Sequence, residues 1–237
     1  MFHWGATGPP RFWQTAVAGR TAAREATIPE PVDSGADRTD LSVGSQLTGV
    51  TLTDSDSDLA IGDPAPEFSL PGTDGETHSL ADYADYAALL AVFTCNHCPY
   101  AKAKFDELNH LAATYDDLAV VGINSNDDTR KPDDSFERMV EYVESGTVAY
   151  DAYLRDESHE VARAYGAVCT PDPFLFAREG AVFSLAYHGR IDDAMSPDGD
   201  PDRFHMREAV AAVLSGEDVP FADEDLPSRG CDIKWRR

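Results

Sequence analysis

The stretch that decides the fold runs from residue 88 to residue 115 and reads ALLAVFTCNHCPYAKAKFDELNHLAATY. Its first part, Ala88 to Thr94, is a continuous apolar run, which is typical of a short strand buried on both faces of a sheet. The part from Pro99 to Tyr115 carries apolar residues at helical spacing, which predicts an amphipathic helix. Cys95 and Cys98 therefore lie where a buried strand gives way to a helix.

Strands and helices alternate on the C-terminal side of this stretch. The pattern predicts a strand, two helices, a two-stranded hairpin and a last helix, at residues 118–124, 135–145, 158–165, 174–187 and 204–214. Before the stretch, residues 69–80 are predicted to form a hairpin around an Asp-Gly turn. The order predicts an α/β fold, with a mixed central sheet flanked by helices and an N-terminal β-hairpin extension.

Composition divides the chain into three parts, residues 1–59, 60–217 and 218–237. The first part is rich in Gly, Pro, Ser, Thr and Asp, so we expect it to be disordered. A further hypothesis is that the start site is placed too early and that Val50 is the true initiator, so that residues 1–49 would be absent from the native protein. The second part is the compact domain, and the third is expected to be a tail.

The chain is strongly acidic, with a formal net charge of −24 at pH 7, and lysine occurs only at Lys102, Lys104, Lys131 and Lys234. At molar salt the Debye length falls to roughly 3 Å, so such a surface stays soluble without self-repulsion. We therefore expect a halophilic surface. The charge excludes nucleic acid as a partner, because phosphate binding needs clustered Lys and Arg. An acidic surface that binds a basic partner is the alternative.

The sequence favours a cytoplasmic protein with no membrane partner. No apolar run reaches the roughly 18 residues that a membrane-spanning helix needs. Residues 1–19 lack the apolar core of a signal peptide. In a reducing compartment, the four cysteines are expected to be catalytic or metal-binding rather than structural disulfides.

The placement of Cys95-Asn96-His97-Cys98-Pro99 predicts reactive thiols. Proline favours the first position of a helix, which makes Cys98 the residue that caps it. Unpaired backbone N–H groups at a helix start favour thiolate over thiol, so we expect a lowered pKa for Cys98. A protonated His97 would act in the same direction. Cys95 lies near enough in the chain for a short disulfide with Cys98.

Five segments resemble the thioredoxin-like, peroxiredoxin-related proteins, the alkyl hydroperoxide reductase/thiol-specific antioxidant group, and in particular its peroxiredoxin-like branch. They are FTCNHCPY (93–100), GDPAPEFSL (62–70), VCTPDPFLF (168–176), GRIDD (189–193) and GCDIKW (230–235). The resemblance covers about residues 60–237 and implies a thioredoxin-like fold and an oxidoreductase without an organic cofactor. It also implies that Pro171 is a cis-proline facing the active site.

A departure from the family pattern leaves the nucleophile open. A typical peroxiredoxin has Thr or Ser three residues before its reactive cysteine, whereas here Thr94 lies four before Cys98 and Val92 lies three before Cys95. We favour Cys98 as the nucleophile and Cys95 as the resolving thiol, and the opposite assignment is the alternative. Cys169 and Cys231 are further candidates for the resolving role, or else a buried core thiol and a spare one.

The expected substrates are a protein or small-molecule disulfide, which Cys98 would attack to give a mixed disulfide, or a peroxide, which would oxidise it to a sulfenic acid. A thioredoxin-type protein or a small thiol would then supply the electrons. The alternative is a protein that binds or delivers copper or zinc through Cys95, His97 and Cys98, because these side chains suit such ions. A redox sensor that carries out no turnover is a third hypothesis.

Overall fold

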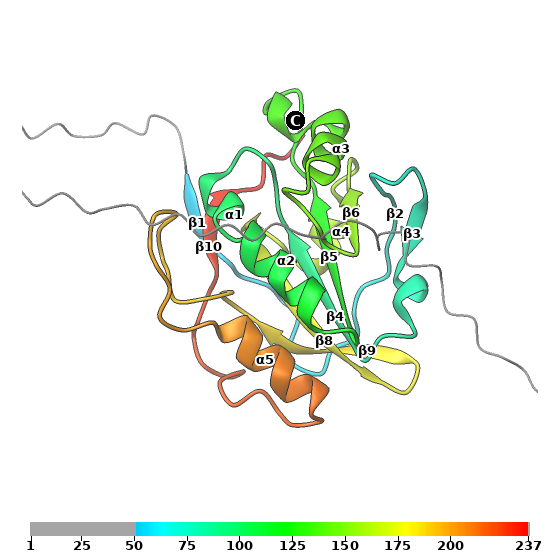
Figure 1. The fold of residues 1–237 in the computed structure, drawn as a ribbon, viewed down its shortest axis with the longest axis vertical. Helices are drawn as coiled ribbons and strands as arrows, with labels where there is room; N and C mark the ends of the chain where they lie inside the picture. Colours follow the sequence, from blue (N-terminus) through cyan, green and yellow to red (C-terminus); the bar gives the residue numbers. More distant parts are fainter. Residues whose placement is uncertain (1–50, 237) are drawn as a thin grey trace, which may run out of the picture. The chain divides into compact units, whose positions relative to one another are not determined.

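The computed structural model describes residues 51–236. Its centre is a five-stranded sheet of order β6-β5-β4-β8-β9, in which β4, β5 and β6 run parallel and β8 runs antiparallel to both β4 and β9 (Figure 1). The strands are Ala88–Phe93 (β4), Leu118–Asn124 (β5), Ala152–Arg155 (β6), Asp172–Glu179 (β8) and Val182–His188 (β9). The predicted mixed sheet is confirmed, and β6 is a strand that the sequence pattern did not predict.

Both faces of this sheet are covered, which explains the continuous apolar run of β4. Side chains alternate along a strand, so Leu89 and Phe93 enter one core cluster while Leu90 and Val92 enter the other. The first cluster includes α4, and the second includes α2 and α5, which lie in front of the sheet in Figure 1. The long helices are Phe105–Thr114 (α2), Phe136–Glu144 (α3), Glu160–Tyr165 (α4) and His205–Leu214 (α5).

The helix predicted from residue 99 to residue 115 is interrupted. A turn at residues 103–104 separates α1 (Pro99–Lys102) from α2. At this turn, Nζ of Lys104 lies 2.6 Å from a carboxylate oxygen of the buried Asp192. Tertiary contacts of this kind override a helical sequence pattern, which in itself contains no residue that breaks a helix here.

Two strands form the predicted N-terminal hairpin. Ser69–Pro71 (β2) pairs antiparallel with Thr77–Ser79 (β3), and Gly75 in the connecting turn has a φ of 87°. Positive φ favours glycine because it has no Cβ, so the Asp-Gly signal identified this turn correctly. The short helix η1 (Leu80–Tyr83) leads from the hairpin to the central sheet.

A third sheet corrects the expected domain boundaries. It has the order β1-β10-β7 and consists of Leu52–Asp54 (β1), Arg229–Asp232 (β10) and Cys169–Thr170 (β7). The expectation of disorder up to residue 59 is therefore wrong for residues 51–59, and residues 218–237 are not merely a tail. Residues 1–50, including the proposed initiator Val50, lie outside the described residues.

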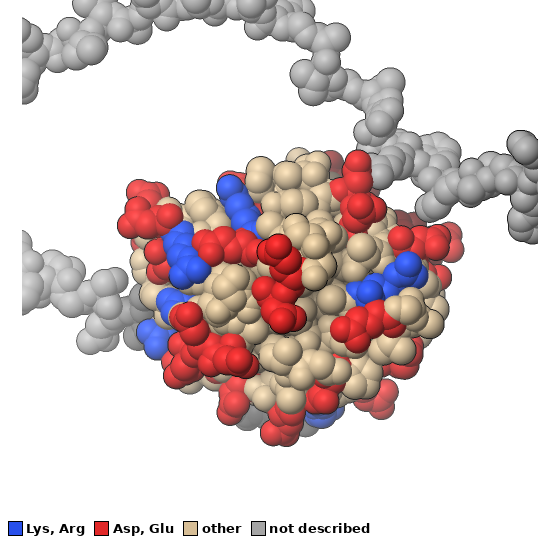
Figure 2. Space-filling model, turned by 90° about the horizontal axis from the view of Figure 1, so that it is seen from below, with Lys and Arg blue, Asp and Glu red and all other residues tan. Residues whose placement is uncertain are grey.

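Charged side chains are spread over the surface. The face drawn in Figure 2 carries several separate groups of Asp and Glu side chains and few Lys and Arg side chains. The acidity of the chain is thus a property of the whole face rather than of one site.

Within residues 51–236, none of the helices combines the length and the apolar character needed to cross a membrane.

Candidate functional site

Cys98 lies at the junction that the sequence predicted. Strand β4 ends at Phe93, a loop follows, and Cys98 is the N-cap of α1, with Pro99 at the first helical position. The carbonyl of Cys98 accepts a 3.0 Å hydrogen bond from the backbone N–H of Lys102, which closes the first turn. The predicted capping position is confirmed. Helix α1 spans only Pro99–Lys102, and the Cys98 side chain, which is engaged in a disulfide, accepts no hydrogen bond from its N–H groups.

Cys98 forms a disulfide with Cys231, 133 residues away, and the two Cα atoms are 6.3 Å apart. The sequence instead favoured a Cys95–Cys98 disulfide, but Cys95 is a free thiol in this structure. Strand β10 explains the difference, because its pairing with β7 brings Cys231 into the same buried cluster as Cys98. Of the two further resolving candidates, Cys231 is therefore the one that the fold places against Cys98.

Cys95 is fully buried and points toward the loop before Pro171. Its Sγ lies 3.1 Å from Oγ1 of Thr170, at hydrogen-bond distance. Burial, together with the nearby carboxylate of Asp134, raises the pKa of Cys95 to about 12. A thiol with such a pKa is protonated near neutral pH, and a protonated thiol is a poor nucleophile.

The residues before β8 form the floor of the site. The Thr170–Pro171 peptide bond is cis, as the family resemblance predicted. The carbonyl oxygen of Thr170 lies 3.5 Å from Sγ of Cys98, a contact in which the disulfide sulfur has no proton to donate. Cys169 is a buried free thiol whose Sγ lies 3.7 Å from the carbonyl of Pro171, and burial raises its pKa. It packs outside the cluster that contains the disulfide.

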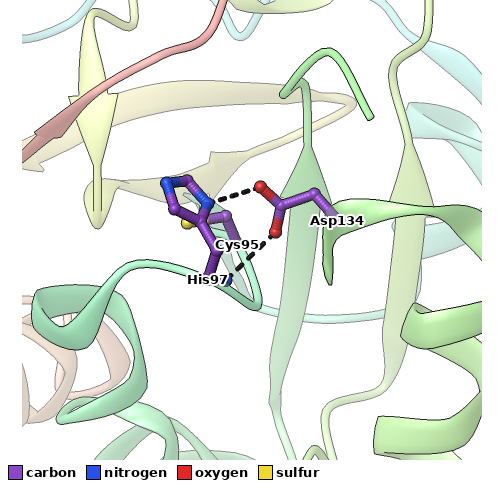
Figure 3. A group of neighbouring side chains, drawn as sticks. All are labelled: Cys95, His97 and Asp134. Atoms are coloured by element: carbon purple, nitrogen blue, oxygen red, sulfur yellow. Dashed lines mark hydrogen bonds and ion pairs between the residues drawn. The ribbon is translucent and has the colours of Figure 1, made fainter. Parts of the chain in front are cut away.

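Asp134, at the end of the short helix η2 (Pro132–Asp134), holds the loop between the two cysteines of the CxxC motif. Its buried carboxylate accepts hydrogen bonds from Nδ1 of His97 at 2.5 Å and from the backbone N–H groups of Asn96 and His97 at 2.7 and 3.2 Å (Figure 3). Nδ2 of Asn126 donates a fourth bond at 2.9 Å. Sequence analysis missed Asp134, because nothing distinguishes it from the other acidic residues of an acidic chain.

A second acid–histidine pair lies directly after Pro171. Nε2 of His188 lies 2.7 Å from the carboxylate of the buried Asp172, and the imidazole stacks on Phe174. Burial raises the pKa of Asp172, and the hydrogen bond from His188 opposes that effect. This pair joins the start of β8 to the end of β9. The sequence offered no signal for it.

Three ligand types that suit zinc lie close together. Ligand atoms of Cys95, His97 and Asp134 are all within 4.8 Å of one another (Figure 3). Among residues 51–236, this is the one group of three side chains that could hold a metal ion. The sequence-based ligand set was Cys95, His97 and Cys98, but Cys98 is engaged in the disulfide. A fourth ligand would have to come from water or a substrate.

A shallow hollow lies beside the disulfide. Its volume is about 20 Å³, which gives room for about one water molecule. The hollow itself is therefore too small to hold a substrate. Side chains from four segments line the hollow: Tyr100, Lys104, Pro171, Arg190, Ile191, Asp192, Ala194, Met195, Ser228 and Arg229.

The sequence from residue 61 to residue 184 matches the AhpC/TSA family. No curated protein matches the chain. Among solved structures, a hypothetical protein from Sinorhizobium meliloti 1021 is 41% identical, with a TM-score of 0.70, and the match covers 78% of this chain and 98% of that one. An uncharacterized conserved protein from Geobacillus kaustophilus is 37% identical, with a TM-score of 0.72, covering 80% and 98%.

A more distant structure is the peroxidoxin BcpB from Mycobacterium tuberculosis. It is 18% identical, with a TM-score of 0.48, and the match covers 66% of this chain and 97% of that chain. The mixed sheet flanked by helices is the thioredoxin-like fold that was predicted, in agreement with the family match.

Proposed function

Since the chain belongs to the AhpC/TSA family, we propose that it is a thiol–disulfide oxidoreductase in which Cys98 is the nucleophile and Cys231 its resolving partner. The single observation that carries the proposal is the Cys98–Cys231 disulfide at the start of α1, beside Pro171. A disulfide at this place is the product that such a reaction leaves behind.

The reaction follows from the sulfur positions. In the reduced protein, the Cys98 thiolate attacks one sulfur of a substrate disulfide and expels the other as a thiolate, which takes up a proton. Cys231, once deprotonated, then attacks Cys98 in the mixed disulfide and releases the second substrate thiol. The protein ends as the Cys98–Cys231 disulfide, having given two electrons to the substrate. A thioredoxin-type protein or a small thiol would return them.

Cys95 supports this reaction without being its nucleophile. It is fully buried and its pKa is raised to about 12, so it stays a thiol while Cys98 reacts. In the reduced protein, its position three residues before Cys98 keeps it as an alternative resolving thiol. The sequence-based assignment of Cys95 as the resolving thiol therefore remains a prediction, and it is the alternative to Cys231 in that role.

Peroxide is the second substrate class that the family supports. The Cys98 thiolate would attack one peroxide oxygen, form a sulfenic acid and expel the other oxygen, which takes up a proton and leaves as water or an alcohol. Condensation with the Cys231 thiol then gives the same disulfide and releases a water molecule. The position of the Thr170 carbonyl and Pro171 next to the sulfur favours the disulfide, because a peptide backbone can use such a carbonyl as a hydrogen-bond acceptor. One experiment should therefore measure activity with a disulfide and with a peroxide.

The test compares insulin-disulfide reduction and hydrogen peroxide consumption at molar salt. Cys98→Ser is expected to abolish both, while Cys231→Ser is expected to accumulate a mixed disulfide with the substrate. Cys169→Ser serves as the matched control, because Cys169 is buried outside the reacting cluster. If Cys98→Ser retains activity, or if only Cys95→Ser accumulates the mixed disulfide, the assigned roles are wrong.

A second candidate function is metal binding, favoured by the Cys95, His97 and Asp134 group. Elemental analysis of untagged protein, purified with the disulfide reduced, tests it. Zinc or copper in a one-to-one ratio that is lost in His97→Ala would support this function. Metal contents well below that ratio would reject it.

A further inference from the structure

Strand β10 joins β7 to β1. Cys231 and Asp232 pair with Thr170 and Cys169 of β7, and the N–H of Ile233 continues the ladder with a 2.9 Å hydrogen bond to the carbonyl of Val168. These are backbone bonds, so they depend on the shape of an extended chain more than on its side chains. The outer edge of β7 is therefore a strand-binding edge, and β10 occupies it.

Gly230 meets this edge so closely that no other residue fits there. A Cβ at this position would lie 1.9 Å from the carbonyl oxygen of Thr170 and 3.0 Å from the nitrogen of Pro171, both backbone atoms. Backbone atoms cannot rotate away as the end of a side chain can. Any strand that replaces β10 in this register must therefore carry glycine immediately before its cysteine.

Cys98 is buried while β10 is in place. In the disulfide form both Cys98 and Cys231, a residue of β10, are buried in one cluster. After reduction, β10 keeps the ladder and two hydrogen bonds that follow it. In these, the backbone N–H of Asp127 donates to the carbonyl of Lys234, and the backbone N–H of Lys234 donates to the side-chain Oδ1 of Asn126. The covalent bond that fixes β10 is lost at the same step that makes Cys98 reactive.

We propose that the edge of β7 is a binding site for an extended protein segment with a Gly-Cys sequence, and that β10 is its resident occupant until the Cys98–Cys231 disulfide is reduced. The site selects substrates in which glycine precedes the reacting cysteine. The partner binds antiparallel to β7 and places its cysteine where Cys231 lies, against Cys98. This inference rests on the proposed function and names the substrate class for it.

The first experiment uses full-length Cys231→Ser, in which Cys98 has no internal partner. The probes are the peptides Arg-Gly-Cys-Asp-Ile-Lys and Arg-Ala-Cys-Asp-Ile-Lys, each joined to 2-thiopyridine by a disulfide. Cys98 attacks the peptide sulfur, forms a peptide–Cys98 disulfide and expels 2-thiopyridone, whose absorbance is followed. The glycine peptide is expected to react at least about tenfold faster, because the extra methyl of the alanine peptide overpacks the edge.

Mercaptoethanol joined to 2-thiopyridine is the control, since it has no backbone to occupy the edge. If this small reagent and both peptides react at one rate, the edge proposal is overturned and the proposed function stands. If none of the three probes modifies Cys98, the proposed function fails instead. A glycine peptide that reacts faster than both other probes supports the proposed binding site on the edge of β7.

The second experiment needs no variant. Hydrogen exchange is measured at the amides of Asp232 and Ile233, which donate to Thr51 and Val168, before and after reduction of the unaltered protein. Reduction is expected to accelerate exchange there by at least about tenfold, while amides of β5 stay protected. Equal protection of β10 in both redox states would overturn the proposal.

Discussion

The carboxylate of Asp134 accepts a 2.5 Å hydrogen bond from Nδ1 of His97, although 37 residues separate the two in the chain. The same carboxylate also accepts both backbone N–H groups of the Asn96–His97 dipeptide. This one buried group therefore sets the path of the loop between Cys95 and Cys98. Its contribution can be tested by removing its charge while keeping its shape.

Asp134→Asn is expected to lower the free energy of unfolding by about 2–3 kcal/mol, because the charge-assisted bonds to a buried carboxylate become neutral ones. Urea denaturation of the oxidised protein measures this. Asp133→Asn is the matched control, since Asp133 is the neighbouring exposed carboxylate and should change stability little. Equal effects of the two substitutions would show that Asp134 does not hold the loop.

Reduction of the Cys98–Cys231 disulfide is expected to destabilise the protein. The two cysteines are 133 residues apart, and closing so long a loop restricts the unfolded chain, which corresponds to about 3–5 kcal/mol. Denaturation with and without a reductant measures the difference. In unfolded, non-reduced protein, only the thiols of Cys95 and Cys169 should react with a thiol reagent.

The variant Cys231→Ser provides the control for this prediction, because it has no such bond to lose. Its stability should not respond to the reductant. A response as large as that of the unaltered protein would mean that the reductant acts elsewhere.

Cys95 should make the protein less stable at alkaline pH. The pKa of Cys95 is raised from 9.0 to about 12 in the folded chain. The contribution of this thiol to the free energy of unfolding is therefore fully present below pH 9 and is lost as the pH rises toward 12. In this window the unfolded thiol ionises while the buried one cannot. Between about pH 8 and pH 10 the loss amounts to about 1.4 kcal/mol.

Denaturation at several pH values compares the unaltered protein with Cys95→Ala. The variant loses a small side chain from the core, so its overall stability differs, but its alkaline slope should be smaller. Cys169 also has a raised pKa and contributes a similar slope in both proteins. An unchanged slope in Cys95→Ala would contradict the buried, protonated state of this thiol.

The sequence predicted the centre of the fold and one half of the site. The apolar run before Cys95 and the proline after Cys98 are local signals, and local signals set the strand, the cap and the helix start. The turn that splits the helix at residues 103–104 depends instead on Asp192, far away in the chain. No local pattern carries that information.

The other half of the site depends on strand pairing over long distances. Strand β10 pairs with β1, about 175 residues earlier in the chain, and with β7, and all three strands are too short to show an alternating pattern. Cys231 could therefore be identified only as a candidate, and its partner could not. Asp134 could not be identified from the sequence either, because it is one of 43 acidic residues.

Gly230→Ala should weaken the Cys98–Cys231 disulfide without touching either sulfur. The added methyl would lie 1.9 Å from the carbonyl oxygen of Thr170, so β10 must shift and carry Cys231 away from Cys98. Equilibration with mixtures of reduced and oxidised glutathione measures the effect. We expect the ratio of disulfide to dithiol protein to fall at least about tenfold at any given mixture. Gly199→Ala is the matched control, because a methyl there meets Oγ of Ser196 at 3.2 Å, in the loop between β9 and α5, and no atom of β7 or β10. If Gly230→Ala forms the disulfide as readily as Gly199→Ala does, the close contact between β10 and β7 does not position Cys231.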